Sequence, residues 1–226
     1  MLSHAMENYL KVIYEILEQE DRATTSLIAG SMGIAAASVT AMVKKLAGMR
    51  LIRYAPYQGV RLTAHGEKTA LEVVRHHRLL ETYLSEALGV PWDRVHEEAD
   101  RLEHVLSEDL EDRIAAALGN PNVDPHGSPI PSRDGIIRRT STRRLTSVGV
   151  GETVTVAEVA DRDSRLLQFL GDLRLFPGTT VEVVAVDPYQ GPLLLRAGGR
   201  EFTLGAAAAE KIRVVSPSSG KETPQS

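Results

Sequence analysis

Residues 24–52 read TTSLIAGSMGIAAASVTAMVKKLAGMRLI, and this stretch decides the fold of the first part of the chain. One short helix is predicted over about 25–31, capped by Thr25 or Ser26, and a glycine then supplies a turn. A second helix is predicted over about 36–48. Its buried face is expected to hold Val39, Met42, Val43 and Leu46. Two short helices joined by a tight turn indicate a helix–turn–helix unit.

The opposite face of the second helix carries small and basic side chains. Small residues let a helix sit deep in the major groove of DNA, where hydroxyl groups reach base edges and lysines suit phosphates. The residues of this helix expected to contact DNA are Ala36, Ala37, Ser38, Thr40, Lys44 and Lys45. The alternative is a helical hairpin with an alanine-rich packing face.

A β-hairpin is predicted directly after this unit, in the sequence LIRYAPYQGVRLTAHG of residues 51–66. Its turn falls at about 56–59, and Arg53, Tyr57 and Arg61 are expected to project from it toward phosphates. A helix–turn–helix followed by such a hairpin indicates a winged helix-turn-helix DNA-binding domain over residues 1–70.

Potential metal ligands gather in the sequence VHEEADRLEHVLS of residues 95–107. If the stretch is one helix, then His96, Asp100, Glu103 and His104 lie on one stripe. A divalent cation would satisfy these groups together, since they are costly to bury unpaired. The bland alternative is a solvated acidic helix face. His77 and Glu81, four residues apart on a preceding helix, favour the metal site.

The rest of the chain divides by composition. Residues 71–137 are predicted to form a helical metal-binding and dimerisation domain, and residues 138–150 a linker. Residues 151–216 alternate apolar and polar side chains, which predicts a small SH3-like β-barrel. Residues 217–226 are expected to be a disordered tail. The fold class is therefore mostly α with β.

Bulk properties exclude several classes of protein. The 226 residues include no cysteine, so disulfides and thiolate metal sites are excluded. The N-terminal residues show neither a signal peptide nor a membrane span, which predicts a soluble cytoplasmic protein with no membrane partner. The net charge of −4 hides an asymmetry. Residues 1–70 have 8 Lys and Arg against 6 Asp and Glu, whereas residues 71–118 have 5 against 12.

Taken together, these segments resemble the diphtheria-toxin-repressor family of metal-dependent transcriptional regulators, especially its manganese-responsive branch. The resemblance covers nearly the whole chain, to about Val215. It rests on YLKVIYE in the first helix, SVTAMVKKL in the recognition helix, HRLLE, HEEADRLEHVLS, the PHGSPIP turn and the C-terminal β-domain. The paired ligand segments are its specific part, because a winged helix alone occurs in many regulators.

The resemblance implies two metal sites. The primary site matches Asn8, Asp100, Glu103 and His104. The ancillary site matches His77, Glu81 and His96, with Asp161 and Asp163 as candidate ligands from the third domain. His76 is expected to be a surface residue beside the ligand, and His126 to order its own turn.

Three positions depart from the family's patterns. Iron-responsive members usually have cysteine and methionine where this chain has Asp100 and Asn8, and oxygen ligands favour Mn²⁺ over softer ions. Manganese-responsive members often have Asp at the position of Asn8 and Glu at that of Lys11. The positive charge of Lys11 argues against a closely spaced pair of metal ions.

The expected function is a Mn²⁺-activated repressor of metal-uptake genes that binds palindromic operator DNA as a homodimer. Without metal, carboxylate repulsion is expected to leave the first helix loosely held. An iron-responsive regulator using Fe²⁺ is the alternative within the family. A metallohydrolase is a third interpretation, but a ligand set closed by protein atoms argues against an enzyme. In a fourth, the acidic helices bind a partner protein instead of sensing metal.

Overall fold

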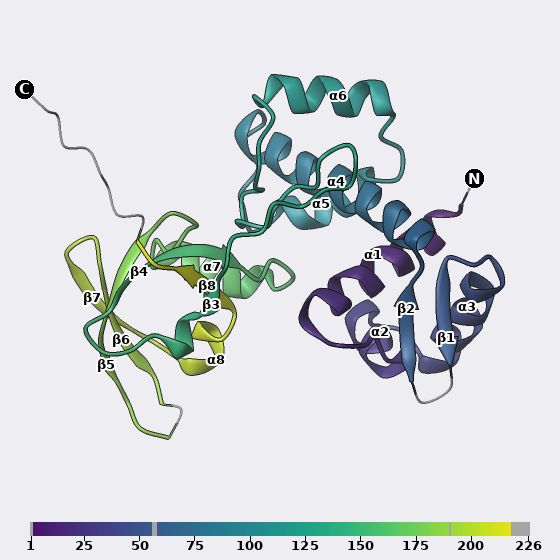
Figure 1. Ribbon diagram of the computed structural model, residues 1–226. Helices are drawn as coiled ribbons and strands as arrows, with labels where there is room; N and C mark the ends of the chain where they lie inside the picture. The colour runs from purple at the N-terminus through teal and green to yellow at the C-terminus, as the bar shows by residue number, and fades with distance from the viewer. Residues whose placement is uncertain (1, 56–57, 190, 218–226) are drawn as a thin grey trace, which may run out of the picture. The chain divides into compact units, whose positions relative to one another are not determined.

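A computed structural model of the chain describes residues 2–55, 58–189 and 191–217. The chain forms two compact units, each assembled from separate segments. Unit 1 comprises Met1–Leu80, Glu98–Asn122 and Ile130–Ile137, and unit 2 comprises Glu81–Glu97, Val123–Pro129 and Arg138–Ser226. Figure 1 shows the elements of both.

Unit 1 begins with a winged helix. Its elements are α1 (His4–Gln19), α2 (Thr25–Met32), α3 (Ala36–Gly48), β1 (Ile52–Ala55) and β2 (Gly59–Leu62). The two strands pair antiparallel, with Arg53 directly opposite Arg61. In Figure 1 this hairpin lies beside α3, as expected for a wing.

One apolar core holds the winged helix together. Amphipathic α1 buries Leu10 and Ile13, and α3 buries Val39, Val43 and Leu46, all fully inaccessible to solvent. Met42, predicted on the same buried face, is only half-buried. Gly33 closes α2 in the left-handed conformation, with φ of 64°, which glycine adopts without strain.

The predicted cap of α2 was displaced by one residue. Neither Thr25 nor Ser26 is the N-cap; the Thr24 hydroxyl accepts a hydrogen bond from the backbone N–H of Leu27 at 3.1 Å. Thr24 has the extended backbone that an N-cap requires, whereas residues 25 and 26 already belong to the helix.

Three further helices follow the wing, namely α4 (Ala64–Glu86), α5 (Val95–Leu102) and α6 (Glu108–Ala117). The expectation of one continuous helix through Ser107 was wrong. α5 ends at Leu102, residues 103–105 form a turn, and the Ser107 hydroxyl caps α6 by accepting from Leu110 N–H at 3.3 Å. Asp100 therefore lies on the helix, while Glu103 and His104 lie on the turn after it.

Unit 2 contains a six-stranded antiparallel sheet with the order β3–β8–β4–β5–β6–β7. The strands are β3 (Arg143–Arg144), β4 (Thr153–Val159), β5 (Thr180–Val186), β6 (Leu193–Ala197), β7 (Arg200–Leu204) and β8 (Ile212–Val215). The other elements are the 3-10 helix η1 (Leu145–Ser147), α7 (Ser164–Asp172) and α8 (Ala206–Ala209). The end strands β3 and β7 do not pair with each other, so the sheet is SH3-like but not a closed barrel. β3 and η1 fall within the predicted linker yet pack on the sheet.

The loop before the sheet is fixed against β4. Gly127, with φ of +89°, lies so close to this strand that a Cβ would come within 1.9 Å of the Ala157 carbonyl oxygen. The backbone N–H of Val159 donates to the His126 carbonyl at 2.9 Å, and the Ser128 hydroxyl donates to Glu158 at 2.8 Å. These contacts hold residues 123–129 on the sheet.

Among the described residues, no single helix has the length and apolar composition needed to cross a membrane. Only α2 and α3 together pass such a test, as a pair bent by 114°.

Candidate metal centre

The first cluster of potential ligands joins α1 to the turn after α5. His104 Nδ1 donates to Glu7 Oε2 at 2.8 Å. The other nitrogen of the ring, Nε2, lies 2.5 Å from Asn8 Oδ1. The sequence predicted Asn8 and His104 here but missed Glu7, which sets the orientation of the His104 ring.

The two carboxylate oxygens of Glu103 have different neighbours within the same cluster. Its side chain is fully buried. Oε1 lies 3.3 Å from His104 Nε2 and accepts no hydrogen bond from the residues that the structure describes. Oε2 accepts from His77 Nδ1 at 2.6 Å. A buried carboxylate oxygen without a donor is costly, so Asn8 Oδ1, Glu103 Oε1 and His104 Nε2 form a donor set that fits a divalent cation.

Lys11 occupies the other side of Glu103. Its ammonium donates to Glu103 Oε2 and to Asp100 Oδ1, both at 2.7 Å, and lies 3.3 Å from His77 Nδ1. Burial lowers the pKa of Lys11, but the charges of Glu103 and Asp100 outweigh this effect and leave the pKa raised. The expectation that the metal-free carboxylates repel each other and release α1 was therefore wrong. Lys11 already ties α1 to Asp100 and Glu103.

His76 supports this cluster from α4 and is buried, so its predicted surface position was wrong. One ring nitrogen contacts the Glu103 carbonyl oxygen at 3.1 Å, and the other contacts Glu111 Oε2 at 2.9 Å. Burial lowers the pKa of His76, but the hydrogen bond and charge of Glu111 raise it by a larger amount. The pKa of His76 is therefore above its ordinary value. A protonated His76 can donate to both partners and fix the backbone at Glu103.

A second cluster lies in unit 2 around Glu81, near the end of α4. His96 Nδ1 lies 3.0 Å from Glu81 Oε1 and 3.8 Å from Asp161 Oδ2. One ligand atom from each of these three residues lies within 4.8 Å of the other two, a spacing suited to a metal ion. The structure thus brings together Glu81, His96 and Asp161, three of the residues singled out from the sequence. Predicted ligand His77 belongs to unit 1, where it contacts Lys11 and Glu103.

The structure does not bring Asp163 into this second cluster. Its Oδ1 accepts from the backbone N–H groups of Arg165 and Leu166, at 3.0 and 3.2 Å. Asp163 is the N-cap of α7, and this role accounts for a carboxylate at the start of the helix.

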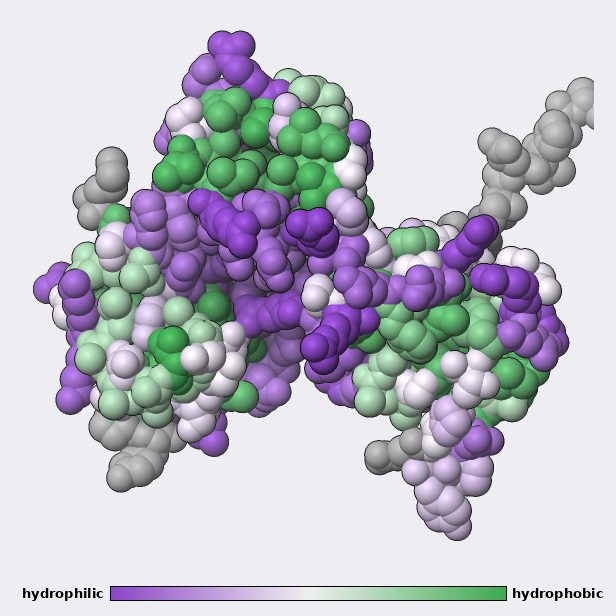
Figure 2. Space-filling model, turned by 180° about the vertical axis from the view of Figure 1, so that it is seen from behind, coloured by the Kyte–Doolittle hydropathy of each residue, from purple (hydrophilic) through white to green (hydrophobic). Residues whose placement is uncertain are grey.

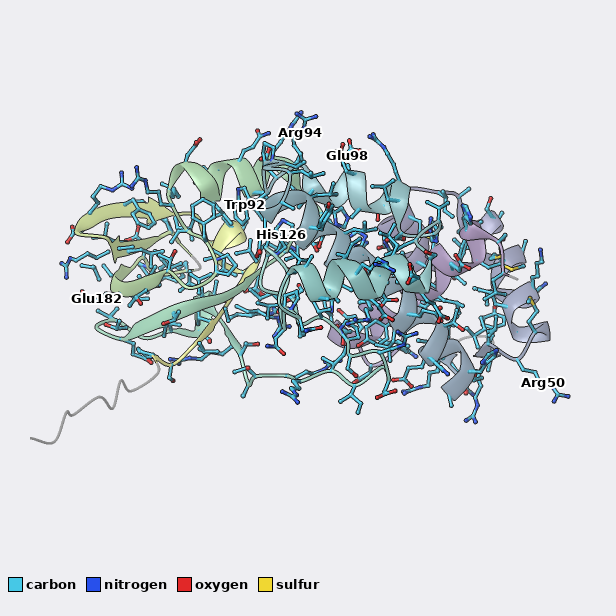
Figure 3. The ribbon with its side chains drawn as sticks, turned by 90° about the horizontal axis from the view of Figure 1, so that it is seen from above. Arg50, Trp92, Arg94, Glu98, His126 and Glu182 are labelled. Carbon is cyan, nitrogen blue, oxygen red and sulfur yellow. The ribbon has the colours of Figure 1, made fainter. Side chains whose placement is uncertain are left out.

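His126 and Asp124 adjoin the same Glu81 carboxylate, and no ligand role was predicted for either of them. His126 Nε2 donates to the Trp92 carbonyl oxygen at 2.7 Å, and Figure 3 shows the two side chains side by side. His126 Nδ1 lies 3.8 Å from Glu81 Oε2. Burial lowers the pKa of His126, but the neighbouring Glu81, Asp124 and Asp161 charges raise it to about 9. The only signal of His126 in the sequence was the PHGSPIP turn that contains it, and Asp124 lies just before this turn.

The DNA-facing residues predicted on the winged helix are accessible. Ala36, Ala37, Ser38, Lys44, Lys45, Arg53 and Arg61 are exposed. Thr40 is half-buried and its hydroxyl donates to the Ala36 carbonyl at 2.9 Å, which restrains it from pointing outward. Tyr57 lies outside the described residues. The basic groups therefore come from both α3 and the wing.

An apolar surface covers the region of α6. Figure 2 shows it as a continuous green area at the top of the molecule. Leu102 at the end of α5, Val105 in the turn after it and Leu110 on α6 are large exposed hydrophobic residues of unit 1, and Val105 is 67% exposed. An apolar patch of this kind is typical of a protein–protein interface.

Three known protein-family models match successive parts of the chain. Residues 1–60 match the N-terminal DNA-binding domain of iron-dependent repressors, and residues 63–132 match their metal-binding and dimerisation domain. Residues 143–216 match the FeoA domain.

Individual relatives match over nearly the full length. The iron-dependent repressor IdeR of Mycobacterium leprae is 31% identical over 220 residues, which cover 92% of this chain and 95% of that protein. A manganese-dependent transcriptional repressor in complex with manganese is 37% identical, with a TM-score of 0.89. The match covers 93% of this chain and 99% of that chain. ScaR with bound Cd²⁺ is 30% identical, with a TM-score of 0.81, and the match covers 93% of this chain and 99% of that chain. The chain therefore belongs to the diphtheria-toxin-repressor family of metal-dependent transcriptional repressors, which are not enzymes.

Proposed function

We propose that this repressor is activated by Mn²⁺, controls metal-uptake genes and binds palindromic operators as a homodimer. The observation that carries the proposal is the convergence of Asn8, Glu103 and His104, with one buried Glu103 oxygen accepting no hydrogen bond from the described residues. Asn8 lies on α1, the first helix of the DNA-binding domain, so ligand binding there acts directly on the DNA-reading module.

The residues around Glu103 form the proposed primary site. Asn8, Glu103 and His104 would hold the ion, with Asp100 at the Lys11 side of the same carboxylate. The proposed ancillary site is formed by Glu81, His96 and Asp161, and His77 and Asp163 remain sequence-based candidates for it. His126 and Asp124 adjoin Glu81 and extend the list of candidate ligands there.

The chemistry of the donors favours Mn²⁺. The primary set offers amide and carboxylate oxygens with one imidazole nitrogen, and oxygen-rich sites suit Mn²⁺ better than soft, sulfur-rich ones do. A relative with manganese in its structure is 37% identical over most of the chain. Fe²⁺ is the second candidate, because the iron-dependent repressor IdeR is 31% identical.

The mechanism follows from which elements the ligands join. Lys11 already attaches the middle of α1 to Asp100 and Glu103, and Glu7 holds the His104 ring toward the start of α1. Asn8, Glu103 and His104 would hold a divalent cation, whose charge would offset the negative charge of Glu103. These ligands would add a second link between α1 and the turn after α5, and the shared core of the winged helix would pass the position of α1 to α3.

The apolar surface over α6 supplies the proposed homodimer contact. A two-fold dimer would present two copies of α3 to successive major grooves, which matches a palindromic operator. The exposed Lys44, Lys45, Arg53 and Arg61 would contact phosphates, and Ser38 would reach base edges.

The proposal is tested by elemental analysis of the purified protein together with metal-by-metal operator binding. We expect Mn²⁺ to be retained and to give tight operator binding at the lowest free metal concentration. Activation by Fe²⁺ alone, measured anaerobically at buffered metal concentrations, would assign the protein to iron instead. The same operator affinity with every metal and with none would reject metal control.

A further inference from the structure

The position of Lys11 carries an inference that rests on the proposed metal site and goes beyond it. Lys11 is only 5% exposed although it lies on the first helix of the chain. Its ammonium is surrounded by an oxygen of Asp100, an oxygen of Glu103 and a nitrogen of His77. These are the atom types that bind divalent metal ions, and here a covalently attached cation lies among them.

We propose that Lys11 permanently fills the second of two cation positions beside Glu103, so that this cluster takes up one metal ion per chain. The two carboxylate oxygens of Glu103 define the positions. Oε2 accepts from Lys11 and from His77. Oε1 faces His104 Nε2, which lies beside Asn8, and accepts no hydrogen bond within the described residues.

The charges of the contacting groups agree with a single ion. Glu7, Asp100 and Glu103 contribute three negative charges and are linked through His104 and Lys11. Lys11 contributes one positive charge, and with neutral imidazoles the remaining two negative charges equal one divalent cation. Glutamate at position 11 would raise the negative charge to four and offer a carboxylate beside Asp100, Glu103 and His77.

Lys11 also stabilises the cluster when no metal ion is bound. An ammonium is a compact charge with three donors, and it holds two carboxylates without any ion. Removing it leaves Asp100 and Glu103 without this partner, and a buried carboxylate that loses its cation is strongly destabilising. Lys11 is therefore a positioning residue. It takes the place of a second metal ion and permanently links α1 to α5.

The test measures how many Mn²⁺ ions bind near Glu103 in the full-length protein and in Lys11→Glu. The Glu81→Gln substitution is present in all samples, because it removes the candidate site in unit 2. Equilibrium dialysis gives the stoichiometry, and electron paramagnetic resonance reports whether two Mn²⁺ ions are close enough to couple. We expect one isolated ion in the Glu81→Gln protein, and a second, magnetically coupled ion after Lys11→Glu.

Lys68→Glu is the matched control, since Lys68 is exposed on α4 and the change in charge is identical. It should leave one uncoupled ion. Lys11→Gln covers the case in which Lys11→Glu folds poorly: without metal it should melt at a lower temperature than the parent, and Mn²⁺ should restore more of its stability. The inference is overturned if the parent binds two coupled ions, or if both Lys11 variants bind one ion and Lys11→Gln melts like the parent. Absence of any ion from the parent would instead reject the proposed metal site.

Discussion

At the scale of single residues, the geometry of the cluster depends on side chains that orient the proposed ligands as well as on the proposed ligands themselves. Glu7 accepts the Nδ1–H of His104 and so directs Nε2 toward Asn8 and Glu103. Such partners of metal-binding histidines set both the tautomer and the basicity of the ring.

Glu7→Gln is expected to weaken Mn²⁺ binding by roughly 10- to 100-fold. The amide keeps the size of the side chain, but its oxygen accepts the Nδ1–H of His104 more weakly than a carboxylate oxygen does. Isothermal titration calorimetry would measure the change. Glu97→Gln is the control, because Glu97 is exposed on α5 and loses the same charge. Equal affinities of the two variants would show that Glu7 does not act on His104.

His126 makes the stability of the metal-free protein depend on pH. Its pKa of about 9 in the folded chain lies above the ordinary value of about 6.5, so folding favours the protonated ring. The stabilisation is fully present below about pH 6.5 and is lost as pH rises through 9. Its size is at most on the order of 3 kcal/mol.

Urea unfolding with a chelator, compared between the wild type and His126→Gln from pH 6 to pH 10, measures this contribution. The difference in unfolding free energy between the two proteins should be largest near pH 6 and should shrink toward pH 10. A difference that does not vary with pH would show that the ring is neutral in the folded protein.

Sequence reasoning identified the candidate ligands more readily than the residues that contact them. Histidines and carboxylates stand out by residue type and by resemblance, as Asn8, Glu103 and His104 did. Glu7, Asp124 and the buried His76 gave no such signal, because their roles arise from contacts between residues far apart in the chain. Lys11 stood out as a charge, but its hydrogen bonds to Asp100 and Glu103 required the fold.

At the scale of elements, the junction between the wing and α4 is tightly packed. A Cβ on Gly66, in the first turn of α4, would lie 1.9 Å from the Leu51 carbonyl oxygen. That oxygen already accepts from the backbone N–H and the hydroxyl of Thr63, both at 3.0 Å. These hydrogen bonds fix the backbone at Leu51 and at Thr63. The start of α4 cannot move away from Leu51 without breaking them.

Gly66→Ala is expected to destabilise the protein by roughly 1–3 kcal/mol, the usual cost of overpacking. Thermal unfolding monitored by circular dichroism would measure it. Gly48→Ala is the matched control, because a Cβ there meets nothing within 4 Å. Gly48 ends α3 without a positive φ, so alanine should be neutral or slightly stabilising. Equal melting temperatures for both variants would contradict the close contact.

The recognition helix offers a prediction about DNA. Lys45 is exposed in the last turn of α3, and its proposed partner is a phosphate. Lys45→Ala should reduce the slope of log affinity against log salt concentration by about 0.9, the effect of one phosphate contact on duplex DNA. Fluorescence anisotropy over a salt series measures the slope. Lys68→Ala, an exposed lysine on α4, should leave it unchanged, and a shared decrease would reflect net charge alone.

The periodicity of the sequence predicted most elements and failed where a helix ended early. α3 and the strands of unit 2 follow their apolar patterns closely. The stretch 95–107 lacks glycine and proline, so nothing local indicated that α5 stops at Leu102. The break places Glu103 and His104 on a turn, where backbone freedom lets both face α1.

At the scale of the whole molecule, the three segments match three family models in the order expected from the sequence. Composition and resemblance were sufficient for that architecture. They were not sufficient for the path of the chain, since each compact unit is built from separate segments and residues 81–97 and 123–129 belong with the β-domain. These assignments depend on packing such as Trp92 against the sheet core, which no local pattern encodes.

The most direct test is operator affinity with Mn²⁺ and with chelator, for the wild type, His104→Ala and the exposed-residue control His65→Ala. Mn²⁺ should tighten binding by about 5- to 150-fold in the wild type and in His65→Ala, the usual range of such coupling. It should have no effect in His104→Ala, whose affinity should stay at the chelator value. The same response to Mn²⁺ in all three proteins would contradict a metal switch at Asn8, Glu103 and His104.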